Sequence, residues 1–470
     1  MKVCAGVAAG PRAPAPERFT TRWLASRLRS MVGPLRGQRL CLAFSGGLDS
    51  SVLLAALAAL RAREGFILRA LHVDHGLQAN SQLWAAAALA QARALRVRCE
   101  TLKLRIALKR GESLEDVARQ RRYQALIGEL ASEELLLTAH HQEDQLETVL
   151  LALLRGSGVR GLAAMNSITP IGHTSLLRPL LPVARAQLEQ FAHTRGLAWT
   201  EDQSNLDERF DRNYLRRQVL PRLQQRWPAA AATASRSAAH LAEAQGLLER
   251  AARVGAGRAA DGAALRISVL RRMSLPERRN VLRSWIAAQG LRVPDHRRLR
   301  EIAGPMLEAR SDALPRVQWR GAELRRHGDQ LFALAQRDAG EQDLIAEWDW
   351  QDQPWVALGS GSTLALIADR HGDVDLAALP CPLRVEFRQG GERLRGTQGR
   401  MALKNLLQSQ GIAPWERSSV PLLRDRGRIV AVADLWVDPE YRAGRQREAA
   451  RGRFRWRRSA ARSACRAVID

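Results

Sequence analysis

The feature that most constrains this chain is a glycine-rich hexapeptide, Ser45-Gly46-Gly47-Leu48-Asp49-Ser50. It follows the apolar run 40–44, which predicts a buried strand, and precedes residues 51–63, which predict a helix. A glycine-rich turn between a strand and a helix aims several backbone N–H groups at one point, where the helix dipole also favours negative charge. The hexapeptide therefore predicts a binding site for an anion, most often a phosphate.

The hexapeptide differs from the common nucleoside-triphosphate loop, which ends in Gly-Lys-Ser/Thr and places the lysine on the β- and γ-phosphates. The sequence contains no Gly-Lys pair. The hexapeptide instead resembles the pyrophosphatase loop (PP-loop) of enzymes that split ATP into AMP and pyrophosphate. This resemblance implies that ATP is bound by the whole loop, that is by Ser45, Gly46, Gly47, Leu48, Asp49 and Ser50.

Strands and helices are predicted to alternate over the first third of the chain. The expected strands are 40–44, 67–73, 97–104 and 134–139, and the expected helices are 51–63, 81–95, 114–131 and 144–154. Apolar strands joined by helices indicate right-handed crossovers, hence an α/β fold with a doubly wound, Rossmann-like parallel sheet. Ligands of such sheets bind at the carboxyl ends of the strands, where Asp74 and His140 also lie.

The charge of the chain points to a polyanionic partner. The 470 residues include 73 Lys plus Arg against 48 Asp plus Glu, a net charge of +25, and only four of the cations are lysines. Arginine pairs bidentately with phosphate and stacks on bases. A coding bias could explain arginine in place of lysine, but not the shortage of acids. The balance favours a nucleic acid, without separating RNA from DNA.

The remaining composition excludes several classes of protein. Five cysteines are scattered without a Cys-x-x-Cys pair, which argues against a disulfide framework and against a zinc or iron–sulfur site. No apolar stretch approaches the roughly 18 residues that span a bilayer, so we expect no membrane association. The first residues, with one lysine ahead of a brief apolar patch and prolines after it, predict a disordered tail rather than a signal peptide, and a cytoplasmic protein.

The length predicts several domains. We expect the α/β domain to be followed by a mostly helical middle domain and a small α+β C-terminal domain, with a hairpin at 320–334. The predicted order is a disordered tail (1–18), the catalytic domain (19–226), a linker helix (227–253), the middle domain (254–337), a connector (338–382), the C-terminal domain (383–442) and a basic disordered tail (443–470).

A second group of polar residues follows the fourth predicted strand, His140-His141-Gln142-Glu143-Asp144-Gln145-Leu146-Glu147-Thr148. Asp144 and Glu147 are three apart, so both carboxylates project from one side of a helix. They could simply complement the helix dipole. The paired histidines suggest a metal, but the further histidine and cysteine ligands of a standard zinc site are missing.

These motifs, in this order, resemble the tRNA(Ile)-lysidine synthase family. The resemblance rests on the hexapeptide, on His72-Val73-Asp74-His75-Gly76-Leu77, on Ala118-Arg119-Gln120-Arg121-Arg122-Tyr123 and on the His-His-x-x-Asp-x-x-Glu-Thr segment. It continues through Arg178-Pro179-Leu180-Leu181, Glu201-Asp202-x-x-Asn205-x-Asp207, Arg212-Asn213-x-x-Arg216, Gly390-Gly391-Glu392-Arg393, Leu403-Lys404 and Pro414-Trp415-Glu416-Arg417. Gln78 departs from the arginine usual in the family, and the first 18 and last 30 residues are additional.

The resemblance implies a two-step reaction on a tRNA(Ile) with a CAU anticodon. Oxygen-2 of the wobble cytidine attacks the α-phosphate of ATP and releases pyrophosphate; the ε-amine of free L-lysine then attacks carbon-2 and displaces AMP. The product, lysidine, changes the codon read from AUG to AUA. Since only about one lysine amine in 2,500 is neutral at pH 7, the second step also needs a group that accepts a proton.

Residue roles follow from the same resemblance. Asp49 is expected to hold Mg²⁺, Asp74 is a second candidate for the metal or the ribose, and Arg122 is a candidate phosphate or cytidine contact, although a surface arginine is an alternative. Asp144 and Glu147 are expected to divide the lysine chemistry, one orienting the ammonium and one acting as the base. The remaining candidates bind lysine or cytidine (Asp202, Asn205, Arg212 and Asn213) or the body of the tRNA (Arg278, Arg279, Arg393, Lys404 and Arg417).

Three other functions are compatible with the loop alone. A tRNA thiolase would need a reactive cysteine or cluster ligands, yet Cys41 and Cys99 fall within predicted strands. A small-molecule amidotransferase or ligase would not need two basic appended domains. An ATP-gated RNA-binding module remains open on motifs alone. The sequence leaves the oligomeric state open, a homodimer being one option.

Overall fold

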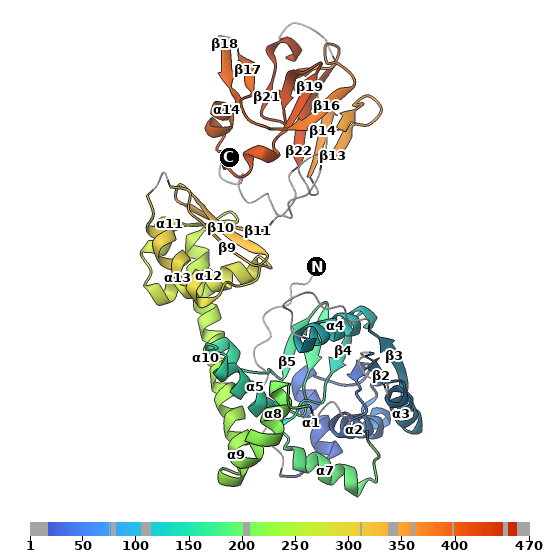
Figure 1. The fold of residues 1–470 in the computed structure, drawn as a ribbon. Helices are drawn as coiled ribbons and strands as arrows, with labels where there is room; N and C mark the ends of the chain where they lie inside the picture. Colours follow the sequence, from blue (N-terminus) through green and yellow to red (C-terminus); the bar gives the residue numbers. More distant parts are fainter. Residues whose placement is uncertain are drawn as a thin grey trace. The chain divides into compact units, whose positions relative to one another are not determined.

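The computed structural model describes residues 17–74, 76, 81–104, 114–200, 207–310, 313–336, 346–358, 362–396, 399–444 and 450–457. The chain divides into two compact units, residues 1–247 and 248–470 (Figure 1). In the described part of the chain, no helix combines the length and the apolar character that crossing a membrane requires. Most of the tail predicted at 1–18 lies outside the described residues.

The first unit is built on a six-stranded sheet in the order β3-β2-β1-β4-β6-β5. Pairing is parallel from β3 through to β6, which confirms the predicted doubly wound sheet; β5 adds an antiparallel edge through its hairpin with β6. The strands are β1 (Arg39–Ala43), β2 (Ile67–Asp74), β3 (Arg98–Lys103), β4 (Glu134–Leu137), β5 (Ile168–Ile171) and β6 (Thr174–Leu177).

Helices cover both faces of this sheet because alternate strand residues point to opposite sides. Leu40 and Leu42 of β1 pack in the same cluster as the apolar residues of α1, α2 and α7, whereas Cys41 packs in a cluster with Leu126 of α4. The helices of the unit are α1 (Thr21–Val32), α2 (Leu48–Glu64), α3 (Ser81–Ala94), α4 (Leu114–Glu129), α5 (Gln142–Leu154), α6 (Val159–Leu162), α7 (Arg185–Thr194), α8 (Asp211–Tyr214) and α9 (Leu220–Arg226), with a π-helical turn at Leu215–Val219.

The second unit begins within the long helix α10 (Ala230–Ala259), which extends beyond the predicted linker. Helices α11 (Ile267–Arg271), α12 (Leu275–Ala288) and α13 (His296–Glu301) share one core with a five-stranded sheet. The sheet has the order β7-β8-β11-β10-β9, and its β10–β11 pair confirms the predicted hairpin. Its strands are β7 (Ala260–Asp261), β8 (Ala264–Arg266), β9 (Arg316–Trp319), β10 (Ala322–His327) and β11 (Gln330–Ala335).

The predicted connector, 338–382, is not a separate segment. Strand β12 (Ala346–Trp348) pairs with β16 (Leu383–Phe387), and the side chain of Trp348 is buried in the same core as the C-terminal strands. This core lies between the sheets β12-β16-β19-β20-β21 and β13-β14-β22-β15. The other elements are β13 (Trp355–Leu358), β14 (Ser362–Ala368), β15 (Val374–Asp375), β17 (Arg393–Gly396), β18 (Gly399–Ala402), α14 (Leu403–Ser409), β19 (Pro421–Asp425), β20 (Arg428–Val432) and β21 (Trp436–Val437).

The prediction of a disordered tail from residue 443 is wrong for residues 451–457. They form β22 (Arg451–Arg457), which lies beside β14 in Figure 1 and pairs with both β14 and β15. Phe454 and Trp456 alternate with exposed arginines and enter the core, so the strand buries one apolar face. Gly452 packs closely in this strand: a Cβ there would lie 2.7 Å from a methyl carbon of Leu376 and 3.2 Å from the carbonyl oxygen of Ile367, so Leu376 would have to move.

Candidate active site

The glycine-rich loop lies where the sequence places it, between β1 and α2. Gly46 has φ +82°, a conformation that costs glycine little. Its carbonyl accepts a hydrogen bond from the N–H of Thr200 at 2.9 Å, and the hydroxyls of Ser45 and Ser50 are 3.0 Å apart. Among the described residues no side chain caps α2, which begins after Gly47. Its first N–H groups are therefore free to bind an anion.

The loop meets the second motif at the point where the strand order reverses. Strands β1 and β4 are neighbours in the sheet, and their crossover connections run in opposite directions. Such a switch point opens a crevice beyond the carboxyl ends of the strands. The loop leaves β1 there, and His140 and His141 follow β4, so the fold brings the two motifs together as predicted.

His141 is the centre of this arrangement, and sequence reasoning missed its role. Its ring is buried among three carboxylates: Nε2 is 3.6 Å from Oδ2 of Asp49 and 3.5 Å from Oδ2 of Asp144, and Nδ1 is 3.0 Å from Oε2 of Glu143. Burial alone would lower the pKa of His141, but the carboxylates of Asp144, Glu143 and Asp49 raise it to about 9. The ring is therefore a cation at neutral pH and holds the acids of both motifs around it.

Asp144 stands at the first turn of α5, where it also closes a capping box. Its Oδ2 accepts a hydrogen bond from the backbone N–H of His141 at 3.0 Å. Burial would raise the pKa of Asp144, but the charges of His141, His140 and Arg212 and this N–H bond lower it to about 2. Asp144 is therefore ionised throughout the neutral range, which suits the capture of an ammonium group and makes it a weak base.

Glu147 lies on the same helix face, one turn further, and is fully buried. Its Oε2 accepts from Nε of Arg212 at 2.9 Å and from Nη2 of Arg216 at 3.1 Å, and its Oε1 accepts from Nε of Arg216 at 2.8 Å. Arg216 also reaches Oδ1 of Asp144 at 3.1 Å. With both oxygens occupied by guanidinium groups, Glu147 is a poor candidate for the base. The division of the lysine chemistry between the two acids stays a prediction, and these contacts favour Asp144 as the acid that meets lysine.

Asp49 offers a ligand atom for a cation. Its Oδ1 is buried and has no hydrogen-bond partner among the described residues. Burial raises the pKa of Asp49, and the charges of His141 and Arg185 work against that rise. The described residues contain no cluster of three or more metal-ligating side chains. Mg²⁺ often uses one or two carboxylates and takes its other ligands from water and phosphates, so Asp49 fits a magnesium ion that arrives with a nucleotide.

A basic group lies beside the acidic one, around His140. Burial, together with the charges of Arg178, Arg122 and Arg212, lowers the pKa of His140 to about 3, although the charge of Asp144 acts in the opposite direction. Burial likewise lowers the pKa of Arg122. Arg122 is therefore not the exposed surface arginine of the alternative interpretation. The site has an acidic side around His141 and a basic side around His140.

Other predicted site residues have structural partners. Asp74, at the end of β2, is buried and accepts a hydrogen bond from the N–H of Gly76 at 2.9 Å. Asn213 donates to the carbonyl of Asp207 at 2.9 Å and so anchors the chain after residue 206. Asp202 and Asn205 lie outside the described residues.

Among the predicted tRNA contacts, Arg278 needs correction. Its side chain is 15 % exposed, and its guanidinium bonds to the carbonyls of Arg271, Met273 and Ala303 and to the carboxylate of Glu308. These partners come from three segments of the middle domain. The side chain therefore stabilises that domain and is poorly placed to bind RNA.

The other four predicted contacts differ in exposure. Arg393 and Lys404 are exposed, and Arg279 is half-buried. Arg417 is half-buried and donates to the carbonyl of Ile412 at 3.0 Å. Arg393 and Lys404 therefore remain the candidates most accessible to RNA.

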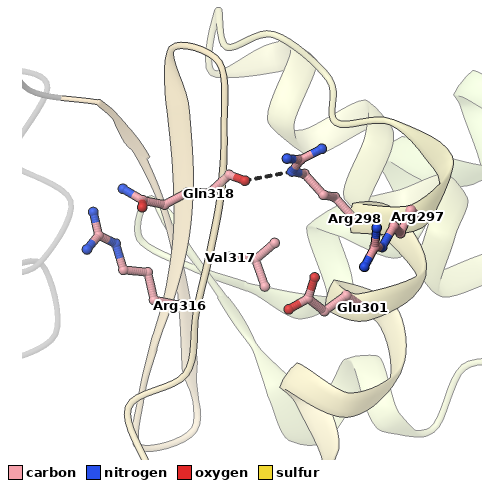
Figure 2. A pocket seen from close by; sticks show the side chains of 6 residues that line it. All are labelled: Arg297, Arg298, Glu301, Arg316, Val317 and Gln318. Atoms are coloured by element: carbon pink, nitrogen blue, oxygen red, sulfur yellow. Dashed lines mark hydrogen bonds between the residues drawn. The ribbon is translucent and has the colours of Figure 1, made fainter.

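The middle domain also has a basic hollow that sequence reasoning did not identify (Figure 2). It measures about 340 Å³ and lies between α13 and β9. Arg298 closes one side through a hydrogen bond to the carbonyl of Gln318 at 2.7 Å. The lining residues are Arg297, Arg298, Glu301, Arg316, Val317 and Gln318.

The described cysteines do not suit sulfur transfer, which needs a thiolate. Burial raises the pKa of Cys41 to about 12 and that of Cys99 to about 11. Burial and a hydrogen bond to Asp349 also raise the pKa of Cys381. These thiols therefore stay protonated at neutral pH, which weighs against the thiolase alternative.

Comparisons with known proteins agree with this geometry. Residues 20–223 match the family model of the PP-loop domain, 265–332 that of the TilS substrate binding domain, and 383–456 that of the TilS substrate C-terminal domain. The tRNA(Ile)-lysidine synthase of Alkalilimnicola ehrlichii is 42% identical over 92% of this chain and 96% of its own. The proteins of the same name from Pseudomonas aeruginosa and Methylococcus capsulatus are 41% and 38% identical over 88% and 86% of this chain, and 93% of each of theirs.

Proposed function

The chain belongs to the tRNA(Ile)-lysidine synthase family, and we propose that it joins free L-lysine to carbon-2 of the wobble cytidine in a CAU-anticodon tRNA(Ile). One observation carries the assignment of this chemistry to the site described above. Asp49 of the ATP loop and Asp144 of α5 lie on the same imidazole nitrogen of His141, at 3.6 and 3.5 Å. A site for ATP and a site for an ammonium group therefore adjoin.

In the first step, oxygen-2 of the cytidine forms a bond to the α-phosphorus of ATP while the bond to the departing pyrophosphate breaks. Negative charge gathers on that pyrophosphate. The free N–H groups at the start of α2 would stabilise this charge, and the N–H of Gly47, which donates to the Ser45 hydroxyl at 3.3 Å, could turn to the same anion. Arg122, on the basic side of the site, is suited to hold a phosphate or the cytidine, whereas Arg178 is buried and donates to the carbonyl of Asn166 and the hydroxyl of Thr169.

Asp49 would hold Mg²⁺ through its unpaired Oδ1. The ion, when bound with ATP, would neutralise charge on the phosphates. His141 contributes independently of any ion, because its cationic ring keeps Asp49 and Asp144 close together although both are negatively charged.

In the second step, the lysine ε-ammonium gives up a proton to the phosphate of the departing AMP, whose second pKa is about 6, as its nitrogen bonds to carbon-2 of the cytidine and the carbon–oxygen bond to AMP breaks. Asp144 would capture the incoming ammonium, because it is ionised and lies in the first turn of α5, whereas Glu147 lies one turn further along the helix. Glu147 would act indirectly by holding Arg212 and Arg216 in place. Arg216 then lies between the two acids and prevents the ammonium from reaching Glu147.

The test follows one turnover with three readouts. The full chain is incubated with a CAU-anticodon tRNA(Ile), ATP and labelled lysine, and label in tRNA, AMP and pyrophosphate are measured together. We expect one AMP and one pyrophosphate for each lysine incorporated, and no incorporation into a matched tRNA whose wobble base is uridine. Pyrophosphate release without lysine transfer, or lysine transfer to the uridine tRNA, would contradict the assignment.

A further inference from the structure

The outer face of the sheet β13-β14-β22-β15 carries a row of arginines that no site above uses. Strand β22 alternates between core and surface, so Arg453, Arg455 and Arg457 all point away from the core and are exposed. They are spaced two residues apart along one strand. Phosphates of an extended backbone can meet such a row one after another.

The neighbouring strands continue this face with small and apolar residues. Residues paired across antiparallel strands lie on the same face of a sheet. Arg455 is paired with Ala365 of β14, and Ala365 is paired with Trp355 of β13. The three residues therefore form one row across the sheet, with Trp355 and Arg455 about 10 Å apart by the usual strand spacing. Because Ala365, between them, has a short side chain, it leaves space between Trp355 and Arg455 on this face.

Trp355 is unusual for its exposure. Its side chain is 57% exposed, and Ile367 of β14, paired with Arg453, is 42% exposed on the same face. A large aromatic ring with a free face beside cationic side chains is the combination that binds single-stranded or splayed nucleotides, because the ring stacks on a base while the cations bind the backbone.

The acids close to this face do not neutralise it. Arg453 pairs with Asp369 at 3.3 Å, and Asp375 lies opposite Arg451 at the β15 edge. Within the described residues, Arg455 and Arg457 have neither an ion pair nor a hydrogen bond to another side chain. The uncompensated charge therefore lies beside Trp355, at the end of the row away from the acids.

We propose that the β13-β14-β22 face binds RNA, with Arg455 and Arg457 on successive phosphates and Trp355 stacked on an unpaired base. The inference rests on the proposed function for the identity of the RNA, which is the tRNA substrate. It gives a role to residues 355–367 and 451–457, which the sequence suggested were a connector and a disordered tail.

The test measures tRNA binding by the full chain over 50–200 mM salt. A double variant, Arg455→Gln with Arg457→Gln, is compared with a control that removes the same charge elsewhere, Arg63→Gln with Arg98→Gln; the control side chains are 61% and 79% exposed. If two phosphate contacts are lost, the ratio of the parent's tRNA affinity to that of the double variant should fall by roughly 7- to 12-fold between 50 and 200 mM salt. The control should leave both affinity and salt slope unchanged.

Trp355 is tested separately, because stacking does not depend on counterion release. Trp355→Ala should weaken tRNA binding without changing the salt slope, and Trp355→Phe should restore most of the affinity. Equal melting temperatures would show that these exposed substitutions leave the fold intact.

The outcomes separate this inference from the proposed function. Lysine transfer at saturating tRNA should persist in every variant, since the catalytic site is unchanged. If transfer is normal but the double variant binds tRNA with the parent's affinity and slope, the face does not bind RNA and the inference fails alone. If the variants instead change the oligomeric state of the chain, the face is a contact between copies, which also overturns it. If the parent protein itself fails to transfer lysine, that result contradicts the proposed function and leaves the RNA-binding inference untouched.

Discussion

Replacing Glu147 by glutamine should destabilise the first unit and slow both half-reactions together. Glu147 is fully buried and accepts three hydrogen bonds from two guanidinium groups. An amide of the same shape keeps one oxygen acceptor but turns the other into a donor. If the remaining oxygen takes the Oε2 position, the bond from Nε of Arg216 is lost and an N–H group faces a guanidinium.

The size of the effect follows from these contacts. One lost charge-assisted hydrogen bond costs about 1.5–3 kcal/mol, and removing one partner of a buried ion pair costs about 3–5 kcal/mol. The side chains of Arg212 and Arg216 are 24% and 32% exposed, so water can replace part of what they lose. We therefore expect the free energy of unfolding to fall by about 3 kcal/mol. For a unit of this size, that lowers the melting temperature by roughly 6–12 °C.

The assay combines thermal unfolding with separate measurements of tRNA-dependent pyrophosphate release and of lysine transfer. Glu100→Gln is the matched control, because its pair with Arg98 is exposed, and such pairs contribute about 0–1 kcal/mol. If Glu147→Gln keeps the parent's melting temperature and pyrophosphate release but loses lysine transfer, Glu147 contacts lysine directly and the positioning role is refuted.

Three further predictions address the neighbouring groups. Asp49→Asn should abolish tRNA-dependent pyrophosphate release and lower the melting temperature only slightly, since Oδ1 has no partner among the described residues and Oδ2 is 3.6 Å from His141; near-normal release by the folded variant would exclude a metal-binding role. Asp144→Asn should raise the KM for lysine by about 10- to 100-fold, the loss of one charge-assisted contact, and leave pyrophosphate release in place; an unchanged KM would assign the ammonium to another group. Because folding raises the pKa of His141 to about 9, its stabilising effect is complete below pH 6.5 and is lost as the pH rises through 9; urea unfolding should show up to roughly 3 kcal/mol less stability above pH 9, a decline that His141→Gln removes.

The sequence predicted the first unit well because its signals are local. Apolar runs separated by helical patterns gave β1 to β4 and α2 to α5 within a few residues, and the crossover rule then gave the parallel order. The antiparallel edge β5 and the helices α1 and α7 were not predicted. Helix α1 nevertheless carries local signals, because Thr20 caps its start and Leu24 and Leu28, four residues apart, face the core.

The C-terminal errors have a different physical cause. In residues 451–457 the alternation of arginine with glycine, phenylalanine and tryptophan is a strand pattern, but the high charge suggested disorder. Strand β22 is stable because β14 and β15 flank it and the core accepts Phe454 and Trp456. Partners that lie some ninety residues earlier in the chain leave no local signal.

Within the active site, spacing predicted which groups meet but not what each does. The i,i+3 spacing placed Asp144 and Glu147 on one helix face, and the four-residue spacing of Arg212 and Arg216 could have predicted a matching basic pair. Burial then separates the roles of the acids: Asp144 is in the first turn of α5 at the switch point, and Glu147 is one turn deeper. The position of His141 among three carboxylates depends on the ends of β1 and β4 lying side by side. Residue spacing along a helix cannot show this.

Arg216 links these roles in a way that bears on lysine binding. It makes two contacts with Glu147 and one with Asp144. An arriving ammonium needs to displace only the single contact to Asp144, at 3.1 Å, while the pair on Glu147 keeps the guanidinium in place. The exchange replaces one cation by another beside the same carboxylate, so Asp144 is never left without a counter-charge. A lysine analogue without the ε-ammonium could not compensate for that displaced contact, and we expect such an analogue to bind weakly even though its carbon chain still fits.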